Sequence, residues 1–201
     1  MQPTAAPLLL LGGTFDPPHL GHLVLAECAR TQFASTAALP SVLFLPAGDP
    51  YRKASRFVSP ALHRLAMTRL AVASNPNFVV DDREVRREGP SYTVDTLEEL
   101  HSEGHANLIL LLGTDAIADM PNWKQPERIR ELATIAVAPK ADGSAELPGP
   151  ANTVFVTMPL LPISSTLIRS RAVAGLPIRY LVPDSVEAYI REHGLYRTRG
   201  A

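Results

Sequence analysis

Short apolar runs recur along the chain, separated by segments of helical or loop-like sequence. Each run is only a few residues long and is rich in Leu, Val, Ile or Phe. Such runs are typical of strands that are buried on both faces of a sheet. They predict strands at residues 8–11, 41–45, 78–80, 108–112, 134–138 and 154–156.

The segments between these runs predict helices. Residues 23–30 contain Ala and Leu throughout, which favours a helix. Ser59 and Pro60 suit the N-cap and first position of a helix that runs to about residue 73. Ser91 or Thr93 is expected to cap a helix that Gly104 ends. Further helices are expected at about 126–133, from 164 and from 183 to 194, with loops at 46–53 and 139–152.

Strands that alternate with helices form a mostly parallel, doubly wound sheet with helices on both faces. We therefore predict a Rossmann-like α/β fold, built as one domain over residues 1–201, with a helical C-terminal portion from about 164 to 201. In such sheets, ligands bind beyond the carboxyl ends of the strands. Three polar segments follow predicted strands and should gather at this edge, namely residues 12–22, 113–115 and 164–169.

The composition excludes several classes of protein. The chain has 201 residues, of which 46% are hydrophobic, so a substantial core is expected. Its formal net charge of −1 argues against nucleic acid as a partner. Cys28 is the only cysteine, which excludes an intrachain disulfide and favours a cytoplasmic location. No apolar run approaches the roughly 20 residues of a membrane span. The sequence leaves the oligomeric state open, and a homo-oligomer is compatible with it.

The first polar segment, GGTFDPPHLGH at residues 12–22, joins a predicted strand to a predicted helix. Glycine amides and a helix N-terminus suit a bound phosphate, and an imidazole can donate a hydrogen bond to it. We expect His19 and His22 to straddle the start of the helix rather than to stack one turn apart. A zinc site is the rival interpretation, but a third ligand at a typical metal spacing is missing.

The second polar segment contains Ser164, Ser165 and Thr166, followed by Arg169. Hydroxyl groups and helix amides can hold a polyphosphate, and Arg supplies a bidentate positive charge. Alone, this is a common N-cap pattern. Together with residues 12–22, it predicts a nucleotide site.

Both segments match signatures of a known superfamily. GGTFDPPHLGHL resembles the G-x-F-x-P-x-H-x-G-H signature of the nucleotidyltransferases, and ISSTLIR at residues 163–169 resembles their second, phosphate-binding signature. Further segments resemble the bacterial nicotinate-mononucleotide adenylyltransferases: GPSYTVDTL at 89–97, LLGTDA at 111–116, Trp123 and YLVPDSVEAYI at 180–190. The resemblance implies adenylyl transfer from ATP to nicotinate mononucleotide, giving deamido-NAD and pyrophosphate in NAD biosynthesis. The attack would be direct, without a covalent enzyme intermediate.

The resemblance also implies a role for individual residues. His19, His22 and Arg169 would be catalytic. The acceptor mononucleotide would contact Lys53, Tyr92, Thr93 and Trp123. Mg²⁺ would be held mainly by the ATP phosphates, and no protein ligand for it is named. The ATP site would comprise Gly12, Gly13, Thr14, Phe15, His19, Gly21, His22, Gly113, Asp115, Ile163, Ser164, Ser165, Thr166 and Arg169.

Several residues have a structural alternative. Asp115 could cap its helix, and Trp123 could be a half-buried hydrophobic residue. We interpret Asp81 and Asp82 as a solvated strand end rather than a catalytic pair, and residues 84–88 as a charged surface turn. Residues 50–53 read Pro-Tyr-Arg-Lys where the family commonly has Pro-Pro-His-Lys, and Ala-Pro-Lys at 138–140 replaces a frequent Arg-Pro-Gly. Arg52 and Lys140 are therefore left outside the predicted site.

Three other functions compete with this hypothesis. One is a related adenylyltransferase that uses nicotinamide mononucleotide or phosphopantetheine. Another is a nucleotide sensor that keeps the pocket without catalysis, although the presence of His19, His22 and Arg169 argues against it. The third is a fragment of a class I synthetase, which would need a Lys-Met-Ser-Lys-Ser-like loop that the chain lacks.

Overall fold

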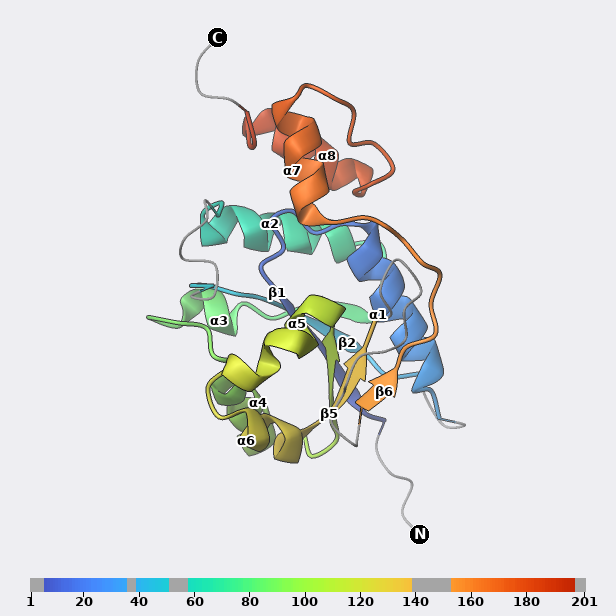
Figure 1. Cartoon of the computed structure of the whole chain (residues 1–201), viewed down its shortest axis with the longest axis vertical. Helices are drawn as coiled ribbons and strands as arrows, with labels where there is room; N and C mark the ends of the chain where they lie inside the picture. Colours follow the sequence, from blue (N-terminus) through green and yellow to red (C-terminus); the bar gives the residue numbers. More distant parts are fainter. Residues whose placement is uncertain (1–5, 36–38, 51–57, 139–152, 198–201) are drawn as a thin grey trace.

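The computed structural model describes residues 6–35, 39–50, 58–138 and 153–197. Its strands form one parallel sheet in the order β3-β2-β1-β4-β5-β6 (Figure 1). The winding direction therefore reverses between the central strands β1 and β4. The bounds are β1 Leu8–Gly13, β2 Val42–Pro46, β3 Phe78–Val80, β4 Leu108–Leu112, β5 Ala133–Val137 and β6 Thr153–Phe155.

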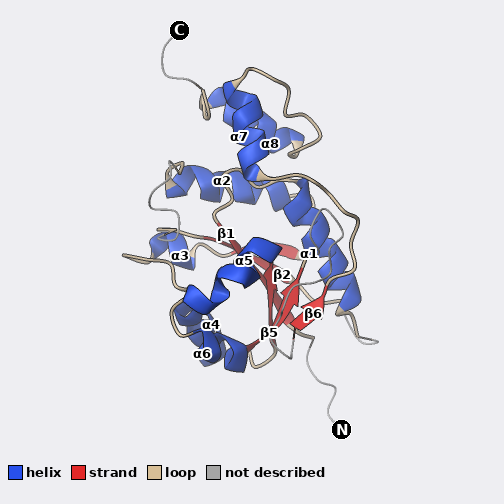
Figure 2. Cartoon of the chain, viewed as in Figure 1, coloured by secondary structure: helices blue, strands red, loops and turns tan. Residues whose placement is uncertain are grey.

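The predicted strands and the α/β class are confirmed, with strand ends shifted by at most two residues. Every described pairing is parallel. The LILLL sequence of β4 is buried along its whole length, because helices cover both faces of the sheet (Figure 2). The alternation of side chains divides β1 between two cores: Leu10 faces one apolar cluster, and Leu9 and Leu11 face the other.

Two sets of helices supply these cores. α4 (Thr93–Ser102), α5 (Thr114–Asp119) and α6 (Pro126–Leu132) contribute to the cluster that contains Leu10. α1 (Leu20–Gln32) and α2 (Ala61–Val72) contribute to the cluster that contains Leu9 and Leu11. The sheet edge with the carboxyl ends of the strands is thus bordered by the first turns of helices from both sets.

The C-terminal helices α7 (Ser165–Val173) and α8 (Asp184–Glu192) lie at one end of the molecule, beyond α2 (Figure 1). They pack on α2 through a third apolar cluster that includes Met67, Ile168, Val186 and Ile190. None of the helices in the described ranges is both long and apolar enough to span a bilayer.

Several predicted helix starts are wrong. At α4 the reason is that a distant segment takes the hydroxyl group that was expected to cap the helix. α1 begins at Leu20, three residues earlier than predicted. Pro60, not Ser59, is the N-cap of α2, and Tyr92, not Ser91 or Thr93, is the N-cap of α4. The Ser91 hydroxyl instead accepts the Gly48 N–H at 2.9 Å, in the loop after β2.

Two short helices and one buried carboxyl group were not predicted. α3 (Arg83–Arg86) and the 3₁₀ helix η2 (Met120–Asn122) replace expected loops. The surface-turn interpretation of 84–88 fails at Glu84, which is buried and accepts a hydrogen bond from the Thr96 hydroxyl at 2.8 Å. Burial raises the pKa of Glu84. The predicted loop at 139–152 lies outside the described residues.

Candidate active site

The loop that follows β1 makes a tight turn over the sheet edge. Phe15 has a φ of 49°, in the left-handed region that residues with a side chain rarely adopt. Its ring is 1% exposed and packs edge-on against the His22 ring, with centroids 5.0 Å apart. Burial of this ring therefore holds an unfavourable backbone conformation in place.

The two histidines of this segment lie at the start of α1, as predicted. His19 is the N-cap and His22 is the third residue of the helix. The expectation that they do not stack is wrong, since their rings lie 3.7 Å apart with an interplanar angle of 27°. The extended backbone of the N-cap turns the His19 ring back over the first turn. Gly21 permits this approach, because a Cβ there would lie 3.0 Å from His19 Nδ1.

A backbone hydrogen bond indicates which tautomer of His22 is present. The His19 N–H donates to His22 Nδ1 at 3.1 Å. Nδ1 is therefore an acceptor, and the neutral ring carries its proton on Nε2. His22 thus presents an N–H donor from the side of the ring that faces away from the helix backbone.

The start of α7 is tied to the same loop by side chains. Ser164 caps α7 by accepting the Leu167 N–H at 3.1 Å. The Ser165 hydroxyl donates to the Pro17 carbonyl at 2.9 Å, and Arg169 Nη1 donates to the Asp16 carbonyl at 2.7 Å. These contacts place the predicted phosphate-binding arginine beside the two histidines.

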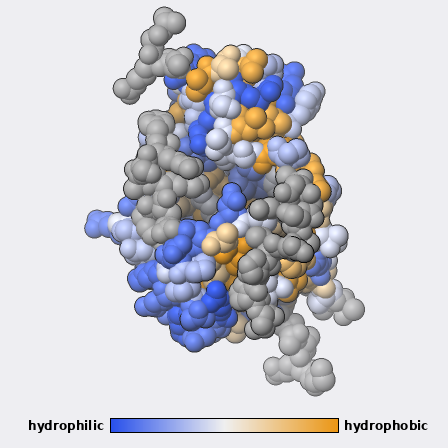
Figure 3. Space-filling model, in the orientation of Figure 1, coloured by the Kyte–Doolittle hydropathy of each residue, from blue (hydrophilic) through white to orange (hydrophobic). Residues whose placement is uncertain are grey.

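A cavity of about 430 Å³ lies between these elements. Figure 3 shows a hollow on this face, between the C-terminal helices and the body of the molecule. Every residue that the resemblance assigns to ATP lines the cavity, from the segment 12–22, from 113–115 and from 163–169. The predicted ATP residues are thus brought together from three distant parts of the chain.

Three of the predicted acceptor residues, Tyr92, Thr93 and Trp123, lie outside the described lining of this cavity. Tyr92 and Trp123 are half-buried against the core cluster of α4 and α6. Lys124 joins them, because its Nζ lies 4.6 Å from the centroid of the Tyr92 ring. Thr93 is the first residue of α4, and the Ser91 N–H donates to the Asp49 carbonyl, so the start of α4 adjoins the loop after β2. Lys53, like Arg52 and Lys140, lies outside the described residues.

The carboxylates considered in the sequence have different surroundings. Asp115 is exposed at the cavity, and Gly113 rather than Asp115 is the N-cap of α5. Asp81 pairs with Arg83 at 2.7 Å, and Asp82 pairs with Arg86 at 2.7 Å. Neither aspartate lines the cavity. Their ion pairs with Arg83 and Arg86 indicate a structural role rather than a catalytic one.

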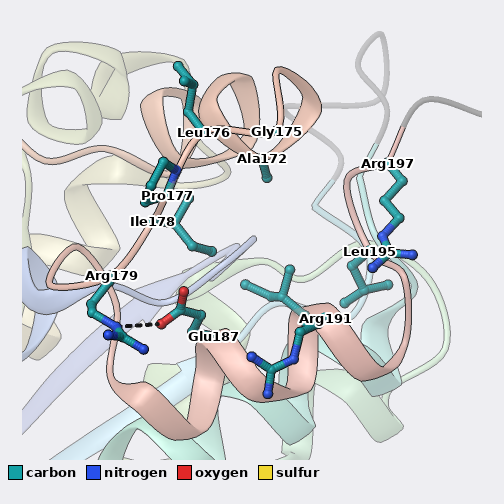
Figure 4. A pocket seen from close by; sticks show the side chains of 11 residues that line it. Ala172, Gly175, Leu176, Pro177, Ile178, Arg179, Glu187, Arg191, Leu195 and Arg197 are labelled. Atoms are coloured by element: carbon teal, nitrogen blue, oxygen red, sulfur yellow. Dashed lines mark ion pairs between the residues drawn. The ribbon is translucent and has the colours of Figure 1, made fainter.

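A second cavity, of about 490 Å³, lies between α7 and α8 (Figure 4). Arg179 and Glu187 approach each other across it at 3.8 Å, and Arg191 also lines it. Among the described residues, its lining includes no strand end, no histidine and no helix N-terminus. Of these two cavities, only the first combines the groups that a nucleotide phosphate requires.

Comparisons with known proteins agree with this geometry. Residues 10–171 match the sequence profile of the family described as Cytidylyltransferase-like. A probable nicotinate-nucleotide adenylyltransferase of Roseiflexus sp. strain RS-1 is 46% identical, and the match covers 96% of this chain and all of that protein. A protein of the same description from Thermomicrobium roseum is 44% identical, over 94% of this chain and 91% of its own length.

This chain belongs to the nicotinate-nucleotide adenylyltransferase family. Solved structures share the fold of this family member at low sequence identity. The Plasmodium falciparum nicotinic acid mononucleotide adenylyltransferase complexed with APC has a TM-score of 0.73 and 16% identity, over 95% of this chain and 97% of that one. The same Plasmodium enzyme complexed with NaAD also has a TM-score of 0.73, with 17% identity, over 94% of this chain and 97% of that one.

Three buried residues of this family member, Asp16, Arg64 and Tyr196, were missed as parts of the site. Asp16 lies in the loop after β1, Arg64 donates to the Thr14 carbonyl of this loop, and Tyr196 donates to Asp16. The sequence does hint at Arg64, because it shares a helix face with Met67, Thr68 and Ala71, and a charged side chain on such a face must find partners. The lining residues 158–161 carry no such signal.

The burial of His19 makes stability depend on pH. Burial lowers the pKa of His19 from 6.5 to about 4, so the folded state binds fewer protons than the unfolded state between these values. The contribution of neutral His19 to the free energy of unfolding is therefore complete above about pH 6.5 and is lost as the pH falls towards 4. At roughly 1.4 kcal/mol per pKa unit, it amounts to about 3 kcal/mol.

We therefore expect the melting temperature to fall between pH 7 and pH 4.5, and to fall less in His19→Gln, whose amide does not titrate. Thermal unfolding of both proteins across this range measures the difference. Parallel pH profiles for the two would show that the burial of His19 does not cause the dependence.

Proposed function

We propose that the cavity at the ends of β1 and β4 transfers the adenylyl group of ATP to nicotinate mononucleotide. A phosphate oxygen of the mononucleotide forms a bond to the α-phosphorus of ATP. The bond from this phosphorus to the oxygen that bridges to the β-phosphate breaks, and pyrophosphate leaves with its electron pair. Because the nucleophile is already an anion, the reaction requires no general base.

The observation that carries this proposal is the convergence of hydrogen-bond donors on one cavity. His22 presents Nε2–H, Arg169 presents its guanidinium, and α7 presents its N-terminal amides. Donors held in place by the protein stabilise the charge that develops on a transferring phosphoryl group. We propose His19, His22 and Arg169 as the catalytic residues, and we propose that the other residues that the resemblance assigns to ATP contact this substrate.

The acceptor would bind beside this cavity, at the start of α4. Tyr92 is the N-cap of α4, and Thr93 is the first residue of its first turn. Backbone N–H groups at a helix start donate hydrogen bonds to a carboxylate, whereas a carboxamide would place its own NH₂ donors against these N–H groups. Trp123 offers a flat ring for the pyridine. These features support nicotinate over nicotinamide mononucleotide.

Mg²⁺ would arrive with ATP. Within the described ranges, no group of three or more His, Cys, Asp or Glu side chains could hold a metal ion. Mg²⁺ commonly keeps several waters and is held by substrate phosphates, so the site is compatible with it. When bound, the ion neutralises charge on the phosphates.

Product analysis with three acceptors tests the proposal. The purified chain is incubated with ATP, Mg²⁺ and nicotinate mononucleotide, nicotinamide mononucleotide or phosphopantetheine, and dinucleotide and pyrophosphate are quantified. We expect the highest kcat/KM with nicotinate mononucleotide. A preference for either other acceptor would overturn the assignment. ATP binding without pyrophosphate release with any acceptor would favour the sensor.

The role of Trp123 has its own test. We expect Trp123→Ala to raise the KM for nicotinate mononucleotide roughly tenfold, because a stacking face for the pyridine is lost. The KM for ATP should change much less and serves as the internal control. Steady-state kinetics with each substrate varied in turn measure both values. An equal rise in both would indicate that Trp123 only packs against the core.

A further inference from the structure

Asp16 connects the loop after β1 to three distant segments. Its side chain is 2% exposed. Oδ1 accepts a hydrogen bond from the Tyr196 hydroxyl at 2.6 Å, and Oδ2 accepts the Ser59 N–H at 3.1 Å. The Asp16 backbone carbonyl accepts from Arg169 Nη1 at 2.7 Å. Asp16 therefore forms hydrogen bonds with three segments: the residue before α2, α7 and the chain after α8.

Arg64 holds the same loop from α2. Its side chain is 1% exposed and donates to the backbone carbonyls of Thr14 at 2.9 Å, Gly48 at 2.8 Å and Ser59 at 2.9 Å. A buried guanidinium is costly unless its donors are paired, and here the carbonyls of three segments pair them. Asp16 provides the nearby opposite charge. The loops after β1 and β2 are thus fixed to one another.

Tyr196 is the part of this network that the proposed chemistry does not explain. It follows α8, is 9% exposed and packs in the cluster of Ile168, Val186 and Ile190. It does not line the nucleotide cavity. Its hydroxyl contacts the loop after β1 through the Asp16 carboxylate. Without the hydroxyl, a buried carboxylate oxygen would lose its partner.

We infer that Tyr196 is a positioning residue for adenylyl transfer, and that it acts through Asp16 to set where the Arg169 guanidinium lies relative to His19 and His22. This inference rests on the proposed function. The physical basis is that Tyr196 holds the Asp16 side chain, while the Asp16 backbone carbonyl accepts a hydrogen bond from Arg169. A small displacement of Asp16 is therefore passed to Arg169, and the rate of in-line transfer is sensitive to such displacements.

Tyr196→Phe, which removes only the hydroxyl, tests this inference. We expect kcat to fall about tenfold, while the KM values for ATP and nicotinate mononucleotide stay within about twofold. Tyr180→Phe is the matched control, because Tyr180 is 78% exposed and, like Tyr196 with a φ of 59°, has a positive φ, of 65°. Its kinetics should not change. Unchanged kcat in Tyr196→Phe, alongside an active parent protein, would overturn the inference and leave the proposed function intact. An inactive parent protein would instead overturn the proposed function.

A double-mutant cycle with Arg169→Lys separates positioning from loss of stability. If Tyr196 acts through Arg169, Tyr196→Phe should lower kcat less than about twofold once Arg169→Lys is present. Multiplicative effects would contradict the inference. Assays are run well below the melting temperature of each variant. If Tyr196→Phe does not fold, Asp16→Asn weakens the same contacts from the other side. It should show the same loss of kcat at unchanged KM, and a normal kcat would again overturn the inference.

Discussion

His22→Ala is expected to lower kcat at least about 100-fold. The imidazole presents Nε2–H to the cavity because its Nδ1 accepts the His19 N–H at 3.1 Å. Loss of one donor that stabilises developing charge costs two to three orders of magnitude in comparable sites. The ring also accepts the His19 N–H and packs against Phe15, so the variant is assayed well below its own melting temperature. Steady-state kinetics with saturating ATP and nicotinate mononucleotide measure the effect.

His101→Ala is the matched control for this substitution. His101 is exposed in the last turn of α4 and does not line the cavity. It should leave kcat unchanged. Near-normal turnover in His22→Ala would refute the role of His22 in the transition state and would leave Arg169 and the helix amides as the stabilising groups.

Gly48→Ala is expected to destabilise the protein by about 3 kcal/mol, at the upper end of overpacking effects. A Cβ at Gly48 would lie 2.0 Å from the backbone carbonyl oxygen of Glu84 and 2.9 Å from its carbonyl carbon. Backbone atoms cannot rotate away, so the loop after β2 or α3 must move. For a chain of this length, the melting temperature should fall by roughly 6–12 °C.

Gly12→Ala is the matched control for stability. A Cβ at Gly12 would meet no atom within 4 Å, because it would face open space at the cavity edge. Its melting temperature should stay within a degree or two of that of the parent protein, as for most neutral surface changes. Equal melting temperatures for the two variants would show that the contact between Gly48 and α3 is not rigid.

The strands and the nucleotide segments could be predicted because their signals are local. A buried parallel strand such as β4 is apolar along its length, and a Gly-rich turn before a helix has few alternative uses. Because the sheet aligns the ends of its strands, the segments at 12–22 and 113–115 had to meet. The family resemblance supplied the individual roles of residues such as Trp123, which no periodicity reveals.

The network beneath the site could not be predicted, because each of its contacts joins distant positions. Asp16 lies within the nucleotide signature, yet nothing in its neighbourhood specifies Tyr196 as a partner. Glu84 lies in a run of charged residues that resembles a surface turn, and only the packing of α4 shows that it is buried. The ring stacking of His19 and His22 depends on the extended backbone at the N-cap.

The contacts between the loop after β1 and the C-terminal helices also affect when the site can form during translation. All six described strands end before residue 156, whereas Ser165, Arg169 and Tyr196 contact residues 148, 153 and 180 positions earlier in the chain. During translation the sheet can therefore assemble while its catalytic edge is still incomplete. A chain that stops before α7 would contain all six strands but would lack Ser165 and Arg169, two of the residues that line the cavity.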